Sequence, residues 1–180
     1  MKLSNRLKNK NLCLTFDDAL RCQYDIAVPV IEDLNIKAFF FVYSSIFSED
    51  PDLFEVYRYF RMNYFKNIEE FYKDFFKVYG ENLNNYFSEK KNKIEKTKQE
   101  FPFYSLSDIK FRLVRDEILN KDEYRKLMSQ MFEQKKFNPK EFYDVLFMSK
   151  SNLIKMKELG HLIGLHSHTH PMVLKKLNYD

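Results

Sequence analysis

Apolar residues form short runs near both ends of the chain and follow a different spacing between them. Leu12–Phe16, Ala38–Val42 and Leu162–Leu165 are mostly apolar, and polar residues follow each run. Such runs are typical of parallel strands that are buried on both faces. We expect the thiol of Cys13, inside the first run, to pack as a small hydrophobe. Between the first two runs, Asp25–Leu34 has helical spacing, so the pattern predicts a β-α-β unit and a third parallel strand.

The apolar positions between residues 50 and 150 repeat at helical spacing. From Phe54 to Tyr79 they recur in steps of three and four, and Gly80 follows as a helix stop. Further helix starts are predicted at Ser107, at an Asn120–Glu123 capping box, at Asn138-Pro139 and at Ser151. The spacing favours a helical core for the many aromatic residues of this segment over an aromatic lid above a sugar site.

Side chains that can bind a metal follow the first and the third predicted strand. Asp17 and Asp18 come directly after the first, and His166, His168 and His170 alternate directly after the third. The carboxyl ends of parallel strands are where α/β barrels carry their chemistry. Two imidazoles four residues apart and one carboxylate form a three-ligand metal set with positions open for water and substrate, and an adjacent carboxylate can act as a base. The pattern therefore predicts a metal-assisted hydrolase.

The sequence leaves alternatives open for these residues. An extended segment places His166, His168 and His170 on one side, whereas a helical turn brings only His166 and His170 together. Pro171 disfavours helical angles at His170 and so predicts a tight loop. The His-x-His pattern is also found in metallo-β-lactamase-like hydrolases. Their motif continues with Asp-His, where this chain has His170-Pro171, which weighs against that interpretation. The two aspartates could cap the next helix, but that helix is predicted to begin near Asp25, too far away to need both.

The segments around these residues resemble the first half of a polysaccharide deacetylase of the NodB-homology kind, carbohydrate esterase family 4. The resemblance lies in Leu12–Ala19 with its Thr-Phe-Asp-Asp, in Ile36–Val42, and in Leu153–Pro171 with its Gly-His-Leu-Ile-Gly and His-Ser-His-Thr-His-Pro. It implies that Asp17 is the catalytic base and that Asp18, His166 and His170 bind the metal. The fold it implies is α/β, a partial, distorted (β/α) barrel of the NodB type.

The chain departs from the family pattern in two respects. Ala19 stands where the family usually has glycine, which is a mild change if φ is negative there. The later family motifs, an Arg-x-Pro-Tyr element and the Leu-x-His that supplies the general acid, are not found, and all four histidines lie between His161 and His170. Three explanations are possible. The chain is the N-terminal part of a longer deacetylase, which is the explanation we favour. Otherwise it is completed by a second polypeptide, or it is a non-catalytic relative.

Relative to the compact family core, the chain has an additional middle segment. We expect residues 1–50 to form the first βαβ part of the barrel, residues 51–150 a large α-helical insertion, and residues 151–180 the third strand with the histidine motif. The sequence contains no internal repeat and no long Gly/Ser/Pro linker. This favours an insertion packed on the barrel fragment over a separately tethered domain.

The expected function is that of a metal-dependent deacetylase that hydrolyses N-acetyl or O-acetyl groups on a sugar or polysaccharide precursor. Two imidazoles and a carboxylate favour Zn²⁺, with Co²⁺ and Ni²⁺ as other divalent candidates. The alternative is a non-catalytic metal- or carbohydrate-binding or assembly module that retains half of the fold. A second chain or the missing C-terminal half would then complete the barrel.

Composition and charge limit the expected partners and cellular location of the protein. The net charge is +4, and the lysines between Lys90 and Lys98 alternate with glutamates, which argues for a solvated helix and against a nucleic-acid partner. The basic N-terminal residues are not followed by an apolar signal region, and no apolar run reaches the ~18 residues of a membrane span. Two cysteines are too few for a disulfide framework. We therefore expect a cytoplasmic protein.

Overall fold

The computed structural model describes residues 12–169 of the chain. The chain divides into two compact units. One unit combines the residues up to Phe54 with those from Lys140 onward, and the other is Glu55–Pro139. The first unit contains the strands and the second is helical, and each is described by itself below.

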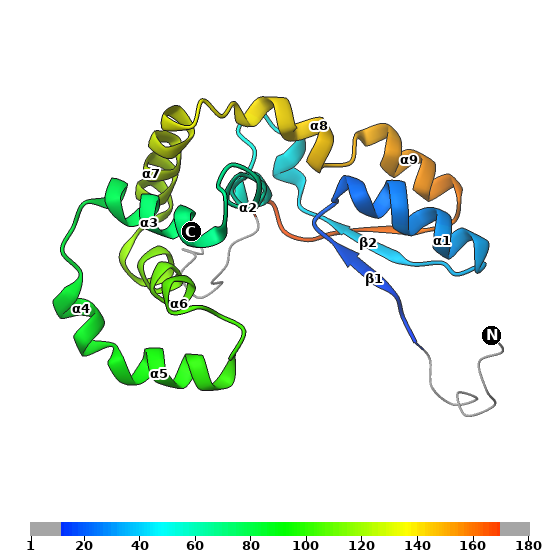
Figure 1. Ribbon diagram of the computed structural model, residues 1–180. Helices are drawn as coiled ribbons and strands as arrows, with labels where there is room; N and C mark the ends of the chain where they lie inside the picture. Colours follow the sequence, from blue (N-terminus) through cyan, green and yellow to red (C-terminus); the bar gives the residue numbers. More distant parts are fainter. Residues whose placement is uncertain (1–11, 170–180) are drawn as a thin grey trace, which may run out of the picture. The chain divides into compact units, whose positions relative to one another are not determined.

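The first unit is built on a three-stranded parallel sheet (Figure 1). Its strands are β1 (Thr15–Asp17), β2 (Phe39–Val42) and β3 (Leu162–Leu165), in the order β1-β2-β3. The protein is therefore an α/β protein, as expected, with β2 between its two neighbours. Among the described residues the sheet is not closed into a barrel, so the barrel expectation holds only as far as the parallel sheet.

The third strand has the predicted bounds, but the first begins later than predicted. The amide N–H of Phe39 donates to the carbonyl of Leu14, which is the first of the described residues to bond to β2. Leu12 has no strand beside it in the described sheet and is 79% exposed. Cys13 is also exposed. The prediction that its thiol packs in a buried strand was therefore wrong, because the neighbouring strand is too short to cover it.

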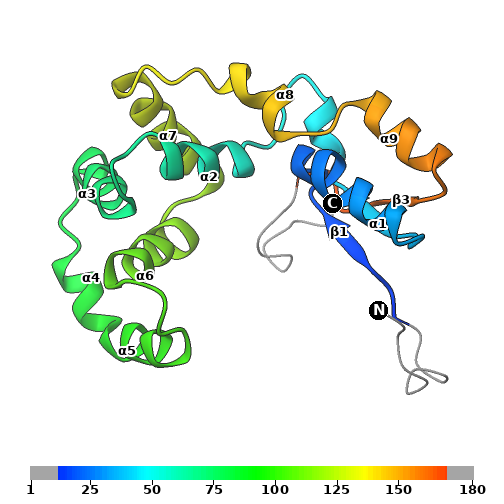
Figure 2. The ribbon, with the colours of Figure 1, turned by 45° about the vertical axis from the view of Figure 1, so that its right-hand side comes forward.

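Two helices cover one face of the sheet, as both ribbon views show (Figures 1 and 2). They are α1 (Val28–Asp33), preceded by the π-helical turn η2 (Gln23–Ala27), and α9 (Lys150–Glu158). Phe40 of β2 is fully buried beneath them and stacks on Phe16 at a centroid distance of 4.8 Å. Val28, Ile31, Met148 and Met156 complete this core. The side chains of the other face are far less covered, and Leu162 is 52% exposed.

Short segments join the sheet to the rest of its unit. The 3₁₀ turn η3 (Ser44–Phe47) follows β2, and η5 (Pro139–Phe142) and α8 (Tyr143–Leu146) precede α9. Beyond α8, Leu20 and Phe147 form an antiparallel bridge, and the amide of Met148 donates to the carbonyl of Ala19 at 2.8 Å. The chain that enters the last helix and strand is thereby attached to the turn after β1.

The second unit is helical and has an aromatic core, as the spacing predicted. In chain order it contains α2 (Phe54–Asn63), α3 (Ile68–Tyr79), α4 (Asn84–Glu89), α5 (Lys91–Glu100), α6 (Leu106–Leu113), the π-helical η4 (Val114–Ile118) and α7 (Lys121–Gln134). The rings of Phe60, Phe71, Phe75 and Phe111 are fully buried. Phe75 and Phe111 meet edge to face at 4.8 Å, a geometry that aromatic pairs prefer.

Local capping signals located several helix ends correctly. Gly80 ends α3 with φ of 77°, and Asn120 with Glu123 forms the predicted capping box of α7. The predicted continuous pattern from Phe54 to Tyr79 is two helices, because the side chain of Asn67 accepts a hydrogen bond from the amide of Glu70 and starts a new helix.

Two predicted serine caps were displaced by two residues. Ser105, not Ser107, caps α6, and Ser149, not Ser151, caps α9. In both cases the earlier serine has extended backbone angles and its hydroxyl accepts from an amide three residues on, which is the geometry of an N-cap. Among the described residues, none of the helices has the length and apolar character that a membrane crossing requires.

Candidate active site

The carboxyl ends of the three strands meet at one edge of the sheet because the strands are parallel. The amide of Asp18, directly after β1, donates to the carbonyl of Phe41 at 2.9 Å. The amide of His166, directly after β3, donates to the carbonyl of Val42 at 2.8 Å. Two consecutive carbonyls of the middle strand thus hold the two outer chains, and this places a predicted carboxylate ligand and a predicted imidazole ligand on either side of β2.

The side chains of Asp18 and His166 face each other across this edge. Oδ1 of Asp18 lies 3.8 Å from Nε2 of His166, and the side chains are 19% and 39% exposed, respectively. This oxygen is shielded from solvent. Two ligand atoms that each lie ~2.1 Å from one metal ion are about 3.4 Å apart at a tetrahedral angle. The pair is therefore spaced within a small side-chain adjustment of a shared ion, and an imidazole with a carboxylate suits a divalent metal ion.

Asp17 lies beside this pair but has a different environment. Alternation along β1 turns Phe16 toward the helices and leaves Asp17 exposed on the other face. The side-chain amide of Gln23 donates to the backbone carbonyl of Asp17 at 2.5 Å. The strand end is thus held by η2 while the Asp17 carboxylate remains open to water. Adjacent aspartates can therefore take different roles, one facing the imidazole and one facing solvent.

The turn after the two aspartates is strained. Asp18 and Ala19 both have left-handed backbone angles, with φ of 75° and 52°. The substitution of glycine by Ala19 was expected to be mild only with a negative φ, and that condition is not met. An L-residue with a Cβ atom in this region costs about 1–2 kcal/mol relative to its preferred conformations. Ala19 is buried and its carbonyl accepts from Met148, contacts that offset this cost.

The histidine segment forms a tight loop over the residues that the structure describes, as Pro171 predicted. Ser167 has φ of 67°, so the segment is neither a strand nor a helical turn. His168 does not point toward the same partner as His166, because its Nδ1 lies 2.9 Å from the hydroxyl oxygen of Ser44. Ser44 was not identified from the sequence. A polar Ser44-Ser45 pair shortly after the apolar run Ala38–Val42 was the available signal.

The third predicted ligand, His170, lies outside the described residues. Within residues 12–169, no group of three His, Cys, Asp or Glu side chains is arranged to hold a metal ion. The part of the predicted ligand set that the structure describes is therefore the pair Asp18 and His166.

His161 is separate from this site. It precedes β3, at the opposite end of the strand, and is 2% exposed. Its Nδ1 accepts from the amide of Ala38 at 3.3 Å, and its Nε2 lies 3.3 Å from Oε1 of Glu32. Burial lowers the pKa of this imidazole below its usual value, an effect that Glu32 opposes. The contacts assign His161 a structural role in joining α1, β2 and β3.

The helical unit contains a buried charged cluster of its own. The hydroxyl of Tyr72 donates to Asp108 at 2.6 Å, and the guanidinium Nε of Arg112 donates to the other oxygen of that carboxylate at 2.9 Å. Burial raises the pKa of the Tyr72 hydroxyl, and the hydrogen bond to Asp108 raises it further. Because Tyr72 packs against the buried rings of Phe71 and Phe111, we interpret this cluster as a structural hydrogen-bond network.

Comparison with known proteins gives one family match. A family model described as polysaccharide deacetylase matches residues 4–104. The matched range includes β1, β2 and both aspartates, and it ends before the histidine loop. No curated protein and no solved structure matches the chain.

Proposed function

Because the chain belongs to the polysaccharide deacetylase family, whose model covers more than half of its residues, we propose that it hydrolyses N-acetyl or O-acetyl groups on a sugar or polysaccharide precursor. The family is one of carbohydrate esterases and deacetylases. The proposal depends mainly on one observation. Oδ1 of Asp18 lies 3.8 Å from Nε2 of His166, and the neighbouring Asp17 is exposed. A carboxylate–imidazole pair can supply two metal ligands, and a solvent-facing carboxylate beside it can act as a base on a water, so this arrangement supports metal-assisted hydrolysis.

Asp18, His166 and His170 are the residues that would hold the divalent metal, with Zn²⁺ as the first candidate for two imidazoles and a carboxylate. Such an ion, when bound, polarises an acyl carbonyl and lowers the pKa of a water. The fit rests on the Asp18–His166 pair, because His170 lies outside the described residues. Shielding of Asp18 Oδ1 from solvent favours a strong interaction with a cation, since the local dielectric constant is low.

Asp17 is proposed as the general base. Its exposed carboxylate accepts the proton from the attacking water while the water oxygen bonds to the acetyl carbon. The same carboxylate then returns the proton to the departing amine nitrogen or alcohol oxygen as the bond to the acetyl carbon breaks, and acetate is released. We assign this double role to Asp17 because its carboxylate is exposed at this edge of the sheet, whereas Nδ1 of His168 is bonded to Ser44 and the buried His161 lies at the far end of β3.

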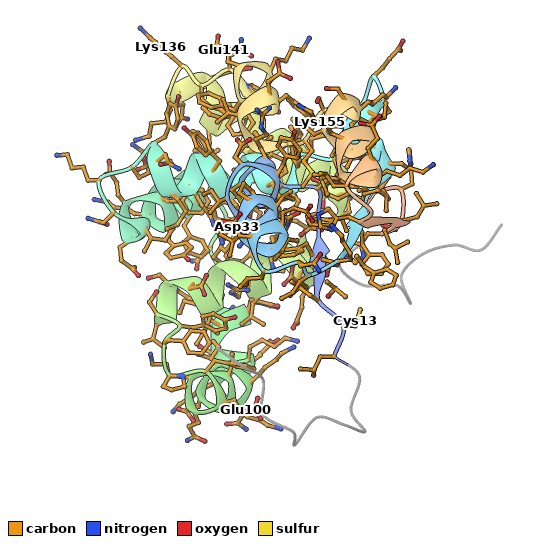
Figure 3. The ribbon with its side chains drawn as sticks, turned by 90° about the vertical axis from the view of Figure 1, so that its right-hand side faces the viewer. Cys13, Asp33, Glu100, Lys136, Glu141 and Lys155 are labelled. Atoms are coloured by element: carbon orange, nitrogen blue, oxygen red, sulfur yellow. The ribbon has the colours of Figure 1, made fainter. Side chains whose placement is uncertain are left out.

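Acetate release by the zinc-loaded full chain tests the proposal. Chitooligosaccharides and acetylated nucleotide sugars are suitable substrates, and Asp17→Asn should lower turnover by about 10²- to 10⁴-fold while zinc is still bound. Asp33→Asn is the matched control, because Asp33 is an exposed carboxylate on α1 (Figure 3), and it should leave turnover unchanged.

Three outcomes would contradict the proposal in different ways. Stoichiometric zinc binding without acetate release on any of these substrates would indicate a non-catalytic metal- or carbohydrate-binding module. Absence of zinc binding by the intact chain would remove the metal site itself. Equal losses in the Asp17 and Asp33 variants would show that the effect does not come from a base at the end of β1.

A further inference from the structure

We propose that Ser44 is a positioning residue that holds the histidine loop in the conformation that places His166 beside Asp18. Its consequence for metal binding rests on the function proposed above. Ser44 is the first residue of η3, two residues beyond the end of the middle strand β2. The inference comes from a set of hydrogen bonds that continues past the end of the sheet.

Backbone bonds first extend the pairing of β2 with β3 into the loop. Next to the bond between the amide of His166 and the carbonyl of Val42, the amide of Ser44 donates to the carbonyl of Ser167 at 3.2 Å. The amide of Ser45 donates to the carbonyl of His168 at 3.0 Å. The residues that follow β2 thus bind the histidine loop along its length, although neither segment is a strand there.

The anchor on the β2 side is itself fixed. Ser45 is fully buried, and its hydroxyl accepts from the amide of Asp52 at 3.2 Å. Its carbonyl accepts from the backbone amide of Ser48 at 2.9 Å. A fully buried residue with both its hydroxyl and its carbonyl bonded is a rigid support, so movement at this edge would come from the histidine loop.

That loop needs to be held because its backbone is in a disfavoured conformation. Ser167, between the two histidines, has φ of 67°, a region that residues with a Cβ atom rarely occupy. The bond between the Ser44 hydroxyl and Nδ1 of His168, at 2.9 Å, ties down the side chain directly after this strained residue. It also fixes the ring orientation of His168, because a hydrogen bond at one ring nitrogen selects the tautomer and the facing of the other.

The expected effect of Ser44→Ala is a partial loss of metal affinity. The backbone bonds remain in this variant, so the loop is loosened and not removed. Loss of one hydrogen bond lowers the population of the competent loop, and the apparent dissociation constant rises by the same factor, about three- to tenfold. Ser44→Thr keeps the hydroxyl and should restore binding.

The test measures the zinc dissociation constant of the full chain by competition with a chromophoric chelator. The variants are Ser44→Ala, Ser44→Thr, His168→Ala and the double variant Ser44→Ala/His168→Ala, with Ser48→Ala as the matched control. Ser48 belongs to the same turn but bonds only within it. Ser44→Ala should weaken binding, Ser48→Ala should not, and Ser44→Ala should add little in the His168→Ala background because it acts through that ring.

An unchanged dissociation constant in Ser44→Ala, or an equal loss in both backgrounds, would overturn the inference. If the wild-type chain binds no zinc, the proposed function fails, and the metal-free protein still decides the role of Ser44. The ¹⁵N chemical shift of His168 Nδ1 should then change in Ser44→Ala and stay unchanged in Ser48→Ala. Identical spectra in all three proteins would overturn the inference.

Discussion

Substitution of Gly164 by alanine tests the packing of the sheet directly behind the site. Gly164 is in β3, and a Cβ atom there would lie 2.7 Å from both Cδ1 and Cε1 of Phe41 in β2. Carbon atoms in normal contact are ~3.5–4.0 Å apart, so the Phe41 ring must move by about 1 Å. The ring is also stacked on Phe39 with centroids 6.1 Å apart, which restricts the directions in which it can move.

The magnitude follows from two opposing effects. Overpacking costs about 1–3 kcal/mol, and we expect the lower part of that range because Phe41 is only half-buried and its ring can turn outward. Replacing glycine by alanine inside a strand contributes about 0.5–1 kcal/mol in the opposite direction, since the unfolded chain loses freedom. The free energy of unfolding should therefore fall by about 0.5–1 kcal/mol in the single variant.

A double-mutant cycle isolates the clash from the change in chain entropy. In a Phe41→Ala background no ring remains to be displaced, so Gly164→Ala should be neutral or stabilising, with a coupling energy of about 1–2 kcal/mol. Phe39→Ala is the matched control, because it removes the neighbouring ring of the same strand and leaves the clash in place. Urea unfolding followed by far-UV circular dichroism measures all variants. Coupling below about 0.5 kcal/mol with Phe41, or equal coupling with Phe39, would refute the reasoning.

Three further predictions concern other parts of the chain. Ala19→Val should lower the free energy of unfolding by about 2–3 kcal/mol, because a β-branched residue is strained at φ of 52°, whereas Ala19→Gly should stay within about 1 kcal/mol of wild type; equal stability of both variants in urea would contradict this. Tyr72→Phe should cost about 1–3 kcal/mol, because it leaves the buried Asp108 carboxylate without the hydroxyl that donates to it; the more exposed hydroxyl of Tyr86 is the control, and a loss in Tyr86→Phe as large as that in Tyr72→Phe would count against the role of burial. Because burial lowers the pKa of His161, the unfolded chain takes up the proton first as pH falls. The contribution of the neutral His161 to the free energy of unfolding should therefore be complete above about pH 6.5 and decline below it. In urea titrations at several pH values His161→Gln should show a smaller decline than wild type, and an equal dependence of the free energy of unfolding on pH would exclude this residue as the cause.

The predicted elements that were confirmed depend on neighbouring residues along the chain. Leu162–Leu165 is a strand with the predicted bounds, and the Asn120–Glu123 capping box starts a helix where the sequence placed it. A cap or a periodic apolar face is formed within a few residues, so its signal is complete in the sequence. The two serine caps are an exception: each lies two residues before the predicted position, because two nearby serines compete and the choice depends on where the preceding turn ends.

The first strand shows what local pattern leaves out. Leu12 and Cys13 are apolar and fit a buried strand, but they are exposed because β2 begins too late to pair with them. Likewise, the neighbours of Ala19 along the chain do not indicate that its φ is positive, and only the glycine usual at this position in the family raised that question. That angle is imposed by the turn that connects β1 to the bridge between Leu20 and Phe147.

The sequence by itself determined the residue types of the site and the strand ends that carry them. Asp17, Asp18 and His166 were predicted from polar residues that follow apolar runs, and the family match is consistent with the first two positions. Only the tertiary structure decided that β2 separates β1 from β3, that its consecutive carbonyls hold Asp18 and His166, and that Ser44 reaches His168. The physical reason is that strand order and contacts between residues more than a hundred positions apart depend on which surfaces pair in the folded chain, and no local spacing records that choice.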